Sequence, residues 1–301
     1  MKLLIQFAPS LIFIIFCSVP SWVVLKFYNK KIKGKKSPLN IELLRSPGDS
    51  IQEQINDIND EIILNLLLMP IIPVLIYPLI LSSFVQSSNK TSTYMISIYI
   101  SIILIATFYF GKKVYELLNK RNKLRVGLEC EKAIGQSLSK LYKYGFNIYH
   151  DLQAGDFNID HVAVGPNGIY SIETKGRSKS IIAKNNNWKV DFDGRRLIFP
   201  GWTEAKPIEQ AINQANWLKK FIQKSTGGEI NVTPVLALPG WFINRKEKSS
   251  ILTINGKNIE FIAKRERLLT DKQIQSISFQ LKKLCIDNSP KSYQKIAQQS
   301  H

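Results

Sequence analysis

Three long apolar runs without a charged side chain fill most of the first third of the sequence, and they limit what the chain can fold into. They occupy residues 3–25, 62–85 and 91–111, and each is long enough to cross a bilayer as a helix. A signal peptide is disfavoured for the first run, because it is longer than the apolar core of a leader and Cys17 follows large residues. We therefore expect a membrane region at residues 1–111 with three transmembrane segments.

The second run contains three prolines, Pro70, Pro73 and Pro78, each of which removes a backbone donor and disturbs a helix. A re-entrant segment is therefore an alternative to a full crossing at this place. No run contains the Asp, Glu, Lys or Arg that a proton or ion path normally uses. A transporter or channel regulated by the rest of the chain is accordingly the least favoured function.

Lysines and arginines cluster after the first and third runs, whereas the loop between the second and third runs has a single lysine. Basic residues next to membrane spans mark the cytoplasmic side. The pattern predicts a multi-pass protein of the cell membrane, with its N-terminus outside and everything after Gly111 in the cytoplasm. Residues 112–125 are expected to form a basic juxtamembrane linker. The clusters comprise Lys26, Lys30, Lys31, Lys33, Lys35 and Lys36, and Lys112, Lys113, Lys120, Arg121, Lys123 and Arg125.

The basic charge of the chain resides mainly in the part after the membrane region. The formal net charge is +18 and the isoelectric point is near 9.7, and residues 112–301 contain 32 Lys and Arg against 17 Asp and Glu. Such an excess favours a polyanionic partner, either nucleic acid or an anionic lipid surface. Attraction to lipid is sufficient for the linker, but basic residues scattered beyond it suit phosphate contacts better. These residues are Lys179, Lys184, Lys189, Arg195, Arg196, Lys219, Lys220, Arg245, Lys246 and Lys248.

Hydrophobic periodicity and turn signals predict an α/β domain after the linker. The order of its elements predicts a mixed sheet flanked by helices. The expected elements are a helix at 127–144, a strand at 146–150, a hairpin within 158–176, a second hairpin around Asp193–Gly194, a helix from Pro207 to about Lys224, a strand at 232–238, a hairpin around Asn255–Gly256 and a helix at 271–285.

Charged residues interrupt the first hairpin, whose other positions are mostly apolar. Asp160 lies in its first strand, and Glu173 and Lys175 lie in its second. Charges are seldom buried in a sheet without a partner or a metal. The hairpin therefore needs an explanation beyond simple packing.

The length of the hairpin loop decides how these charges face each other. A four-residue loop from Gly165 to Gly168 sets Asp160 opposite Glu173, and Lys175 shares their face because it follows Glu173 by two residues. A three-residue loop would put the two acids on opposite faces. Two carboxylates about 4 Å apart repel by roughly 4 kcal/mol at an effective dielectric of about 20, so a native sheet would compensate this charge.

Two forms of compensation are open. Lys175 could neutralise one acid in a structural ion pair. A divalent cation could instead neutralise both acids and leave Lys175 for chemistry, and oxygen ligands with few imidazoles favour Mg²⁺ or Mn²⁺ over Zn²⁺. The geometry of the hairpin does not choose between the two.

Five short motifs carry a resemblance to a known family. They are Gly127-Leu128-Glu129-Cys130-Glu131, Ile159-Asp160-His161-Val162, Gly165-Pro166-Asn167-Gly168, Ile172-Glu173-Thr174-Lys175 and Pro207-Ile208-Glu209-Gln210-Ala211. Together they resemble the nuclease-related domain family, NERD, of the PD-(D/E)xK nuclease superfamily. The resemblance covers about residues 126–238, and members of this family are often joined to transmembrane helices. Where the family usually has Gly before its helical Glu, this chain has Cys130.

The resemblance implies a restriction-endonuclease-like PD-(D/E)xK core within a domain at residues 126–288. It also implies a metal site for Mg²⁺ or Mn²⁺. Asp160 and Glu173 would hold the metal, and Glu131 would reach in from the first helix as a further ligand or as a base.

Two further site residues are implied by the same resemblance. Lys175 would orient the attacking water or neutralise charge that develops on the phosphate. Gln210 would position the phosphate or the water, and Gln214, one turn later on the same helix, is a weaker candidate.

These observations predict a membrane-anchored, metal-dependent nuclease that hydrolyses phosphodiester bonds of DNA or RNA. An alternative from another class is a non-catalytic module that tethers nucleic acid or a protein complex to the membrane. Three acids and a lysine at these spacings favour the enzyme, because a binding module does not need them. Residues 289–301 are expected to be a polar, frayed tail.

Overall fold

The computed structural model describes residues 2–33, 35, 38–39, 42–85, 90–179 and 188–287. Lys36, Lys184 and the expected polar tail at 289–301 lie outside the described residues. The described chain forms two compact units. The first comprises the residues described within Met1–Asn40 and Asn56–Asn122, and the second comprises those within Ile41–Ile55 and Lys123–Ser289.

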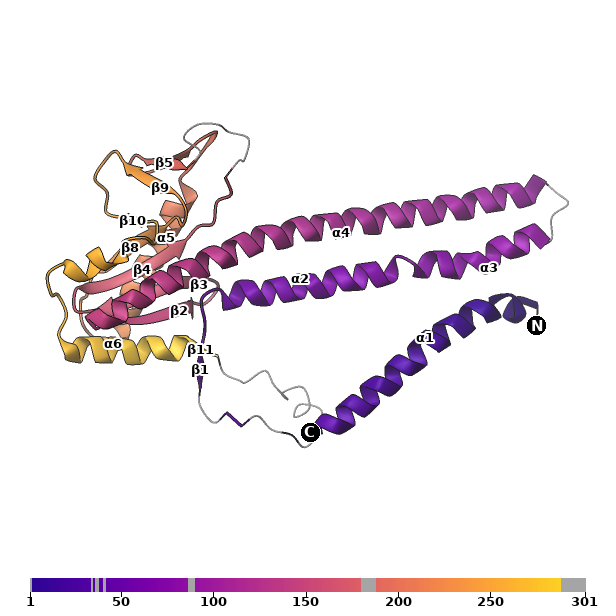
Figure 1. Ribbon diagram of the computed structural model, residues 1–301, viewed down its shortest axis with the longest axis horizontal. Coiled ribbons are helices and arrows are strands. Elements are labelled where there is room, and N and C mark those ends of the chain that lie inside the picture. The colour runs from indigo at the N-terminus through magenta and orange to yellow at the C-terminus, as the bar shows by residue number, and fades with distance from the viewer. Residues whose placement is uncertain are drawn as a thin grey trace. The chain divides into compact units, whose positions relative to one another are not determined.

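The first unit is helical (Figure 1). It contains α1 (Lys2–Ile32), α3 (Ile71–Val85), most of α2 (Asp49–Leu68) and the first part of α4 (Lys90–Leu138). Only some of the prolines in the second apolar run interrupt a helix. The chain leaves helical structure between α2 and α3 at Pro70, whereas Pro78 lies inside α3.

Two helical stretches of the described chain, Asp49–Ser83 and Thr93–Tyr144, are long and apolar enough to cross a membrane. Only 11% and 0% of their apolar windows are buried within the protein. This finding rests on length and composition alone. These two stretches contain the second and third of the expected spans, and the span expected at residues 3–25 remains a prediction. A multi-pass topology and a cytoplasmic domain remain predictions.

The second unit is built on a five-stranded mixed sheet with the order β10-β8-β4-β3-β2. β2, β3 and β4 are antiparallel, while β4, β8 and β10 are parallel. The predicted α/β class with a mixed sheet is therefore confirmed. β4 is a central strand with every residue buried, which explains its content of Ile and Tyr. The strands span Asn147–Gln153 (β2), Asn158–Gly165 (β3), Gly168–Thr174 (β4), Val232–Ala237 (β8) and Leu252–Ile254 (β10).

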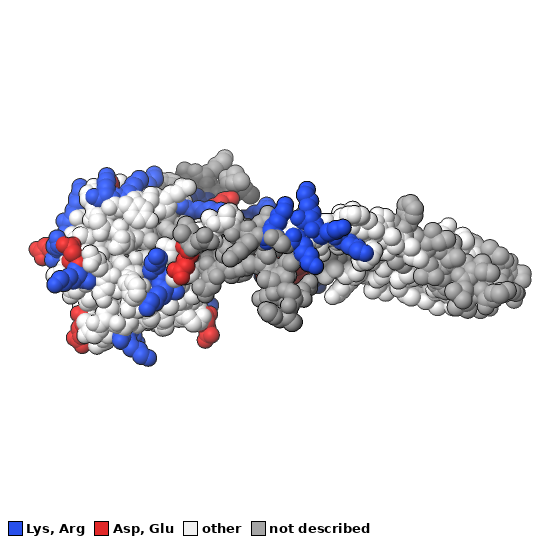
Figure 2. Space-filling model, turned by 90° about the horizontal axis from the view of Figure 1, so that it is seen from below, with Lys and Arg blue, Asp and Glu red and all other residues white. Residues whose placement is uncertain are grey.

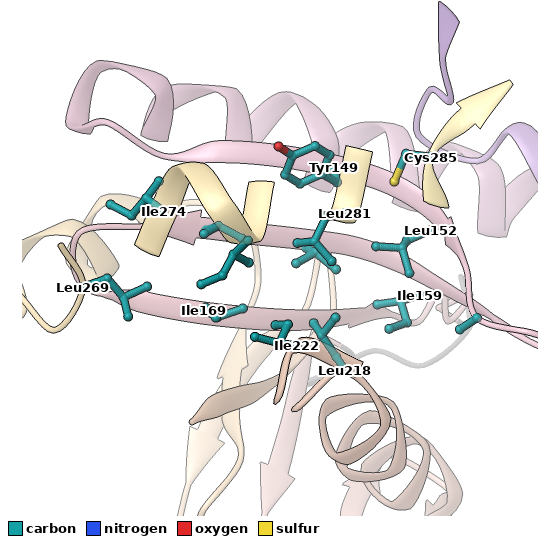
Figure 3. Close-up of a cluster of buried hydrophobic side chains, with 14 residues drawn as sticks. Tyr149, Leu152, Ile159, Ile169, Leu218, Ile222, Leu269, Ile274, Leu281 and Cys285 are labelled. Carbon is teal, nitrogen blue, oxygen red and sulfur yellow. The ribbon is translucent and has the colours of Figure 1, made fainter. Parts of the chain in front are cut away.

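Helices cover both faces of this sheet (Figure 1). On one face, Leu218 of α5 (Lys206–Thr226) and Leu281 of α6 (Asp271–Leu284) join Ile169 of β4 in a buried cluster (Figure 3). On the other face, Leu138 of α4 packs in a second cluster with Tyr170. Ile169 and Tyr170 are neighbours in β4, so the alternation of side chains along the strand assigns them to opposite layers.

The helix ends follow from local sequence. Pro207 stands in the first turn of α5, and Gly227 ends this helix in the left-handed region with φ 73°. Thr270 and Gln273 form a reciprocal capping box at the start of α6. The helix expected at 127–144 is α-helical to Leu138 and continues as a 3₁₀ helix, η1 (Ser139–Tyr144).

A second sheet has four strands in the order β7-β6-β5-β9. β5 and β6 form the hairpin predicted around Asp193–Gly194. β9 pairs in parallel with β5, which links the sheet to residues far along the chain. The strands span Lys189–Phe192 (β5), Leu197–Phe199 (β6), Trp202–Glu204 (β7) and Phe242–Arg245 (β9).

The hairpin predicted around Asn255–Gly256 is wrong. β10 pairs in parallel with β8, and the chain then enters a 3₁₀ helix, η2 (Ile259–Lys264). The side chain of Asn255 accepts a hydrogen bond from the backbone of Lys257 and forms a local turn. Buried Ile259 then returns the chain to the core, so no second strand follows.

The segment before α2 packs within the second unit, although the sequence alone places it in the membrane region 1–111. Its short strand β1 (Leu43–Leu44) pairs with β11 (Ile286–Asp287) at the other end of the described chain. The backbone N–H of Arg45 donates to the carbonyl of Cys285 at 2.8 Å. The second unit therefore includes residues well before residue 126.

Candidate active site

The β3–β4 hairpin has the loop that the sequence predicts. Gly165 pairs with Gly168, and Val164 pairs with Ile169. The ladder ends at His161 and Ile172, so the next step of the same register sets Asp160 opposite Glu173. Beyond His161 and Ile172, a hydrogen bond to a side chain joins the two strands.

Asp160 makes that connection. Its Oδ2 accepts a hydrogen bond from the backbone N–H of Thr174 at 2.6 Å. Burial raises the pKa of Asp160 well above its ordinary value, and the negative charges of Glu173 and Glu131 raise it further. The Thr174 N–H and Lys175 oppose this rise. The carboxylate is thus held in place and lies close enough to two other acids to be repelled by them.

Glu173 is almost fully enclosed, with 1% of its surface exposed. Its Oε1 forms an ion pair with the ammonium of Lys175, whose side chain is 22% exposed. Its Oε2 accepts a hydrogen bond of 2.6 Å from Nε2 of Gln214. Lys175 therefore compensates this acid, as the ion-pair interpretation of the sequence expects.

Glu131 lies in the part of α4 that belongs to the second unit, and 7% of its surface is exposed. No hydrogen bond or ion pair joins it to another residue in the part of the chain that the structure describes. Burial raises the pKa of Glu131 to about 8, assisted by the charges of Asp151 and Glu173 and opposed by that of Lys175. A buried carboxylate without a partner is a poor structural element, and its place beside other acids suits a ligand or a base.

Gln214, the weaker candidate by sequence, makes the contact with Glu173. Its Nε2 also donates to the backbone carbonyl of Asn158 at 3.1 Å. Since both of its N–H groups are engaged, Oε1 is fixed on the other side, and it is buried without a partner among the described residues. Gln210 is half-buried and makes no hydrogen bond that the described residues show, so its role stays a prediction.

A second polar network, which sequence reasoning missed, lies behind Asn158. The carboxylate of Asp151 accepts hydrogen bonds from Arg45 (2.6 Å), from the backbone of Ser50 (2.8 Å) and from Asn158 (2.9 Å). Arg45 and Ser50 precede Asp151 by about a hundred residues. The sequence offers one weak signal for this network, the charged Asp151 directly after His150 within a mostly apolar stretch.

His150 and His161 form a pair of their own. Their Nδ1 atoms lie 2.9 Å apart, and His161 is completely buried. Burial lowers the pKa of His150 to about 4, and burial together with His150 lowers the pKa of His161. Both rings are therefore neutral near pH 7, and His161 is packed in the interior.

Comparison with known protein families gives a match in the second unit. Residues 126–239 match the family described as NERD, the nuclease-related domain. The matched stretch lies within the second unit and is similar to a nuclease-related domain. This match confirms the family suggested by the sequence motifs. Comparison with curated proteins gave no match, and comparison with solved structures gave none either.

The matched region contains every residue that the sequence predicts for the site. Glu131, Asp160 and Glu173 interact electrostatically across the nuclease-related domain, and Lys175 acts on all three. Arg45 of the second network stands outside the matched region. The geometry therefore supports one polar centre with contributions from two separate parts of the sequence.

The residues of this centre can be tested against the implied metal. Within the described ranges, no group of three or more His, Cys, Asp or Glu side chains is arranged to hold an ion. The donor chemistry still suits a hard cation, because the charges of Glu173 and Glu131 raise the pKa of Asp160, and the charge of Glu173 also raises the pKa of Glu131. Gln214 Oε1 and Thr174 Oγ1 also supply buried oxygens that have no partner among the described residues. The residues fit Mg²⁺ or Mn²⁺ by chemistry, provided that Glu131 joins the other two acids.

Proposed function

We propose that the nuclease-related domain hydrolyses phosphodiester bonds in nucleic acid. The observation that carries this proposal is the pairing of Lys175 with Glu173 beside two further acids whose pKa values are raised. Such values are typical of groups that exchange protons or bind cations at working sites. A PD-(D/E)xK core and dependence on Mg²⁺ or Mn²⁺ belong to the same proposal.

Each residue has a role that its surroundings support. Asp160 and Glu173, joined by Glu131, would hold the divalent cation. When bound, this cation would neutralise phosphate charge and lower the pKa of a water molecule. Lys175 is partly exposed and lies at the boundary between the acids and solvent, so it would orient the water and stabilise the negative phosphate oxygens.

The proton of the attacking water needs an acceptor within the site. Glu131 would be this acceptor in its alternative role, as a base and not a ligand, because a pKa raised to about 8 makes its ionised form a better proton acceptor than an ordinary carboxylate. Gln214 would act differently. Its amide N–H groups hold Glu173 and Asn158, and its free Oε1 can accept a hydrogen bond from a bound water.

Nucleic acid is the proposed polymer because the domain is basic. In Figure 2 lysine and arginine side chains are spread over the visible surface with acidic residues between them. Phosphate contacts of this kind give binding that weakens steeply as salt rises. The apolar stretches Asp49–Ser83 and Thr93–Tyr144 would anchor the chain in a bilayer, which adds membrane lipid as a second partner.

A screen of substrates tests the function. The full chain in detergent is incubated with linear DNA, circular DNA or structured RNA, each with Mg²⁺, Mn²⁺ or EDTA. Cleavage that requires the metal and is lost in Glu173→Ala and Lys175→Ala establishes the nuclease and identifies its polymer. Cleavage in EDTA, or cleavage that survives both substitutions, contradicts the proposal.

A second function, tethering of nucleic acid at the membrane, is favoured by one observation. Both carboxylate oxygens of Glu173 are occupied, one by Lys175 and one by Gln214, so the hairpin is also stable as a closed ion pair. Salt-sensitive binding that survives Asp160→Ala and Glu173→Ala, without cleavage on any substrate, would select the tether.

A further inference from the structure

Arg45 lies outside the matched nuclease-related domain, yet it is deeply built into the same unit. Its side chain is 10% exposed, and Nε and Nη2 both lie 2.6 Å from Oδ2 of Asp151. Nη2 also donates to Oγ of Ser50 at 2.9 Å. A guanidinium presents several fixed donors, so it holds the position of its acceptor more tightly than an ammonium would.

Asp151 is held in an unusual conformation. It has φ 49°, and it is the one non-glycine residue with a positive φ that the described residues contain. Left-handed backbone is costly for most side chains and persists where surrounding contacts enforce it. Arg45, Ser50 and Asn158 supply those contacts, since all three donate to the Asp151 carboxylate.

Asn158 connects this arrangement to the proposed active site. Its side-chain amide donates to Asp151 at 2.9 Å, and its backbone carbonyl accepts from Gln214 Nε2 at 3.1 Å. The same nitrogen of Gln214 holds Glu173 at 2.6 Å. An unbroken series of hydrogen bonds therefore runs from Arg45 to the acid that pairs with Lys175.

Pro47 and Gly48, which follow Arg45 in the chain, contact the helix α4 that carries Glu131. A Cβ at Gly135 of α4 would lie 2.5 Å from Cγ of Pro47, so the proline packs directly on this helix. A Cβ at Gly48 would lie 2.4 Å from Leu128 and 3.5 Å from Oε2 of Glu131. The segment thus covers the helical turn of Glu131 and contributes to its burial.

We propose that Arg45 is a positioning residue of the site: acting through Asp151 and Asn158, it fixes the amide of Gln214 and with it the carboxylate of Glu173. Residues 42–55 are then a working part of the nuclease-related unit. The proposal rests on the proposed function for the reaction that Glu173 serves, but the series of contacts exists independently of that reaction.

A double-mutant cycle on the full chain tests the catalytic side. Arg45→Met is expected to lower kcat by about 10–100-fold with little change in KM, as is usual when a residue supporting a ligand is lost. In a Gln214→Ala background the further loss should be less than about threefold, because both substitutions break the same series. Arg45→Lys should recover part of the rate.

A control separates positioning from general stability. Leu281→Ala removes a buried side chain of α6 from the hydrophobic core and takes away no hydrogen bond of the polar series. Its kcat, measured at a temperature where both variants remain folded, should stay near that of the wild type. The proposal would be overturned if the decreases in kcat multiply in the Arg45→Met and Gln214→Ala double variant. It would also be overturned if Arg45→Met and Leu281→Ala lower kcat equally.

Hydrogen exchange supplies a readout that does not depend on cleavage. In Arg45→Met, peptides that contain Asn158 and Thr174 should exchange about tenfold faster than in Leu281→Ala, because local opening would reach the site. Faster exchange confined to residues 42–55 and β2 would show that Arg45 only anchors its own segment. If neither the wild type nor any variant cleaves a substrate, the proposed nuclease is contradicted. The exchange comparison then decides by itself whether Arg45 positions the site.

Discussion

Arg45 and Asp151 form a buried ion pair between residues that are 106 positions apart in the sequence. Their side chains are only 10% and 4% exposed, and nitrogen and oxygen are 2.6 Å apart. Both side chains are largely shielded from water. Removing one partner therefore lowers the stability of the fold more than replacing the whole pair, because the remaining charge stays buried. The pair therefore makes the segment before α2 energetically dependent on strand β2.

The first prediction concerns this dependence. Arg45→Met should lower the free energy of unfolding by about 3–5 kcal/mol, because Asp151 would keep a buried charge. Arg45→Met combined with Asp151→Asn should recover part of this loss, since the charge is removed while an acceptor remains. Denaturant unfolding of the full chain measures both values. A double variant that is less stable than Arg45→Met would contradict the expectation.

The second prediction decides between two glutamines of α5. Gln214→Leu should cost about 1.5–3 kcal/mol of stability, because Glu173 loses a hydrogen bond to a charged group and Asn158 loses a donor. Gln210→Leu should stay within about 0.5 kcal/mol of the wild type. Thermal unfolding of the two matched variants is the measurement, and a larger cost for Gln210→Leu would be the opposite of what the contacts imply.

The third prediction is a pH dependence of stability in EDTA. Glu131 has a pKa of about 8 in the folded chain against an ordinary value of 4.5, so between these values the folded state keeps a proton that the unfolded state has lost. Stability from this group therefore falls as pH rises from about 4.5 to 8. The glutamine in Glu131→Gln cannot ionise. The melting temperature of this variant should therefore exceed that of the wild type by a margin that grows as pH rises through this window.

The control for that experiment is the acidic end of the range. Near pH 4.5 Glu131 is largely protonated in the folded state, so the wild type and Glu131→Gln should melt at similar temperatures. A difference in melting temperature that is the same at every pH would show that Glu131 ionises normally.

The fourth prediction concerns the close approach of α4 to the residue after Lys175. A Cβ at Gly176 would lie 3.1 Å from Sγ of Cys130 and 3.1 Å from the backbone oxygen of Val126. Gly176→Ala should therefore destabilise the chain by about 1–3 kcal/mol through overpacking. Adding Cys130→Ala removes the sulfur contact and should recover part of that loss, as measured by denaturant unfolding. No recovery would place the strain entirely at the Val126 carbonyl.

The hairpin shows how much of the site the sequence could predict. The Gly165–Gly168 loop and the alternation of apolar residues determine the register, and the register brings Asp160 and Glu173 to adjacent strands. These are local properties, so they can be read from one stretch of sequence. The family match confirmed the same region.

The choice between Gln210 and Gln214 was beyond the sequence for a physical reason. Both residues lie on one side of α5, one turn apart, and only the position of the helix along β4 decides which reaches Glu173. Arg45 and Asp151 were harder still, because their pairing depends on the path of a segment far away in the chain. Long-range contacts of this kind leave no periodic signal.

The most direct test of the central claim compares Lys175→Met with the wild type on the cleaved nucleic acid. Single-turnover cleavage is measured at saturating protein with Mg²⁺, and binding is measured in parallel by fluorescence anisotropy in EDTA. We predict a rate at least about a hundredfold lower with nearly unchanged affinity, because Lys175 acts mainly on the transition state. Equal rates for the two proteins, or a loss that follows the loss of binding, would contradict the account.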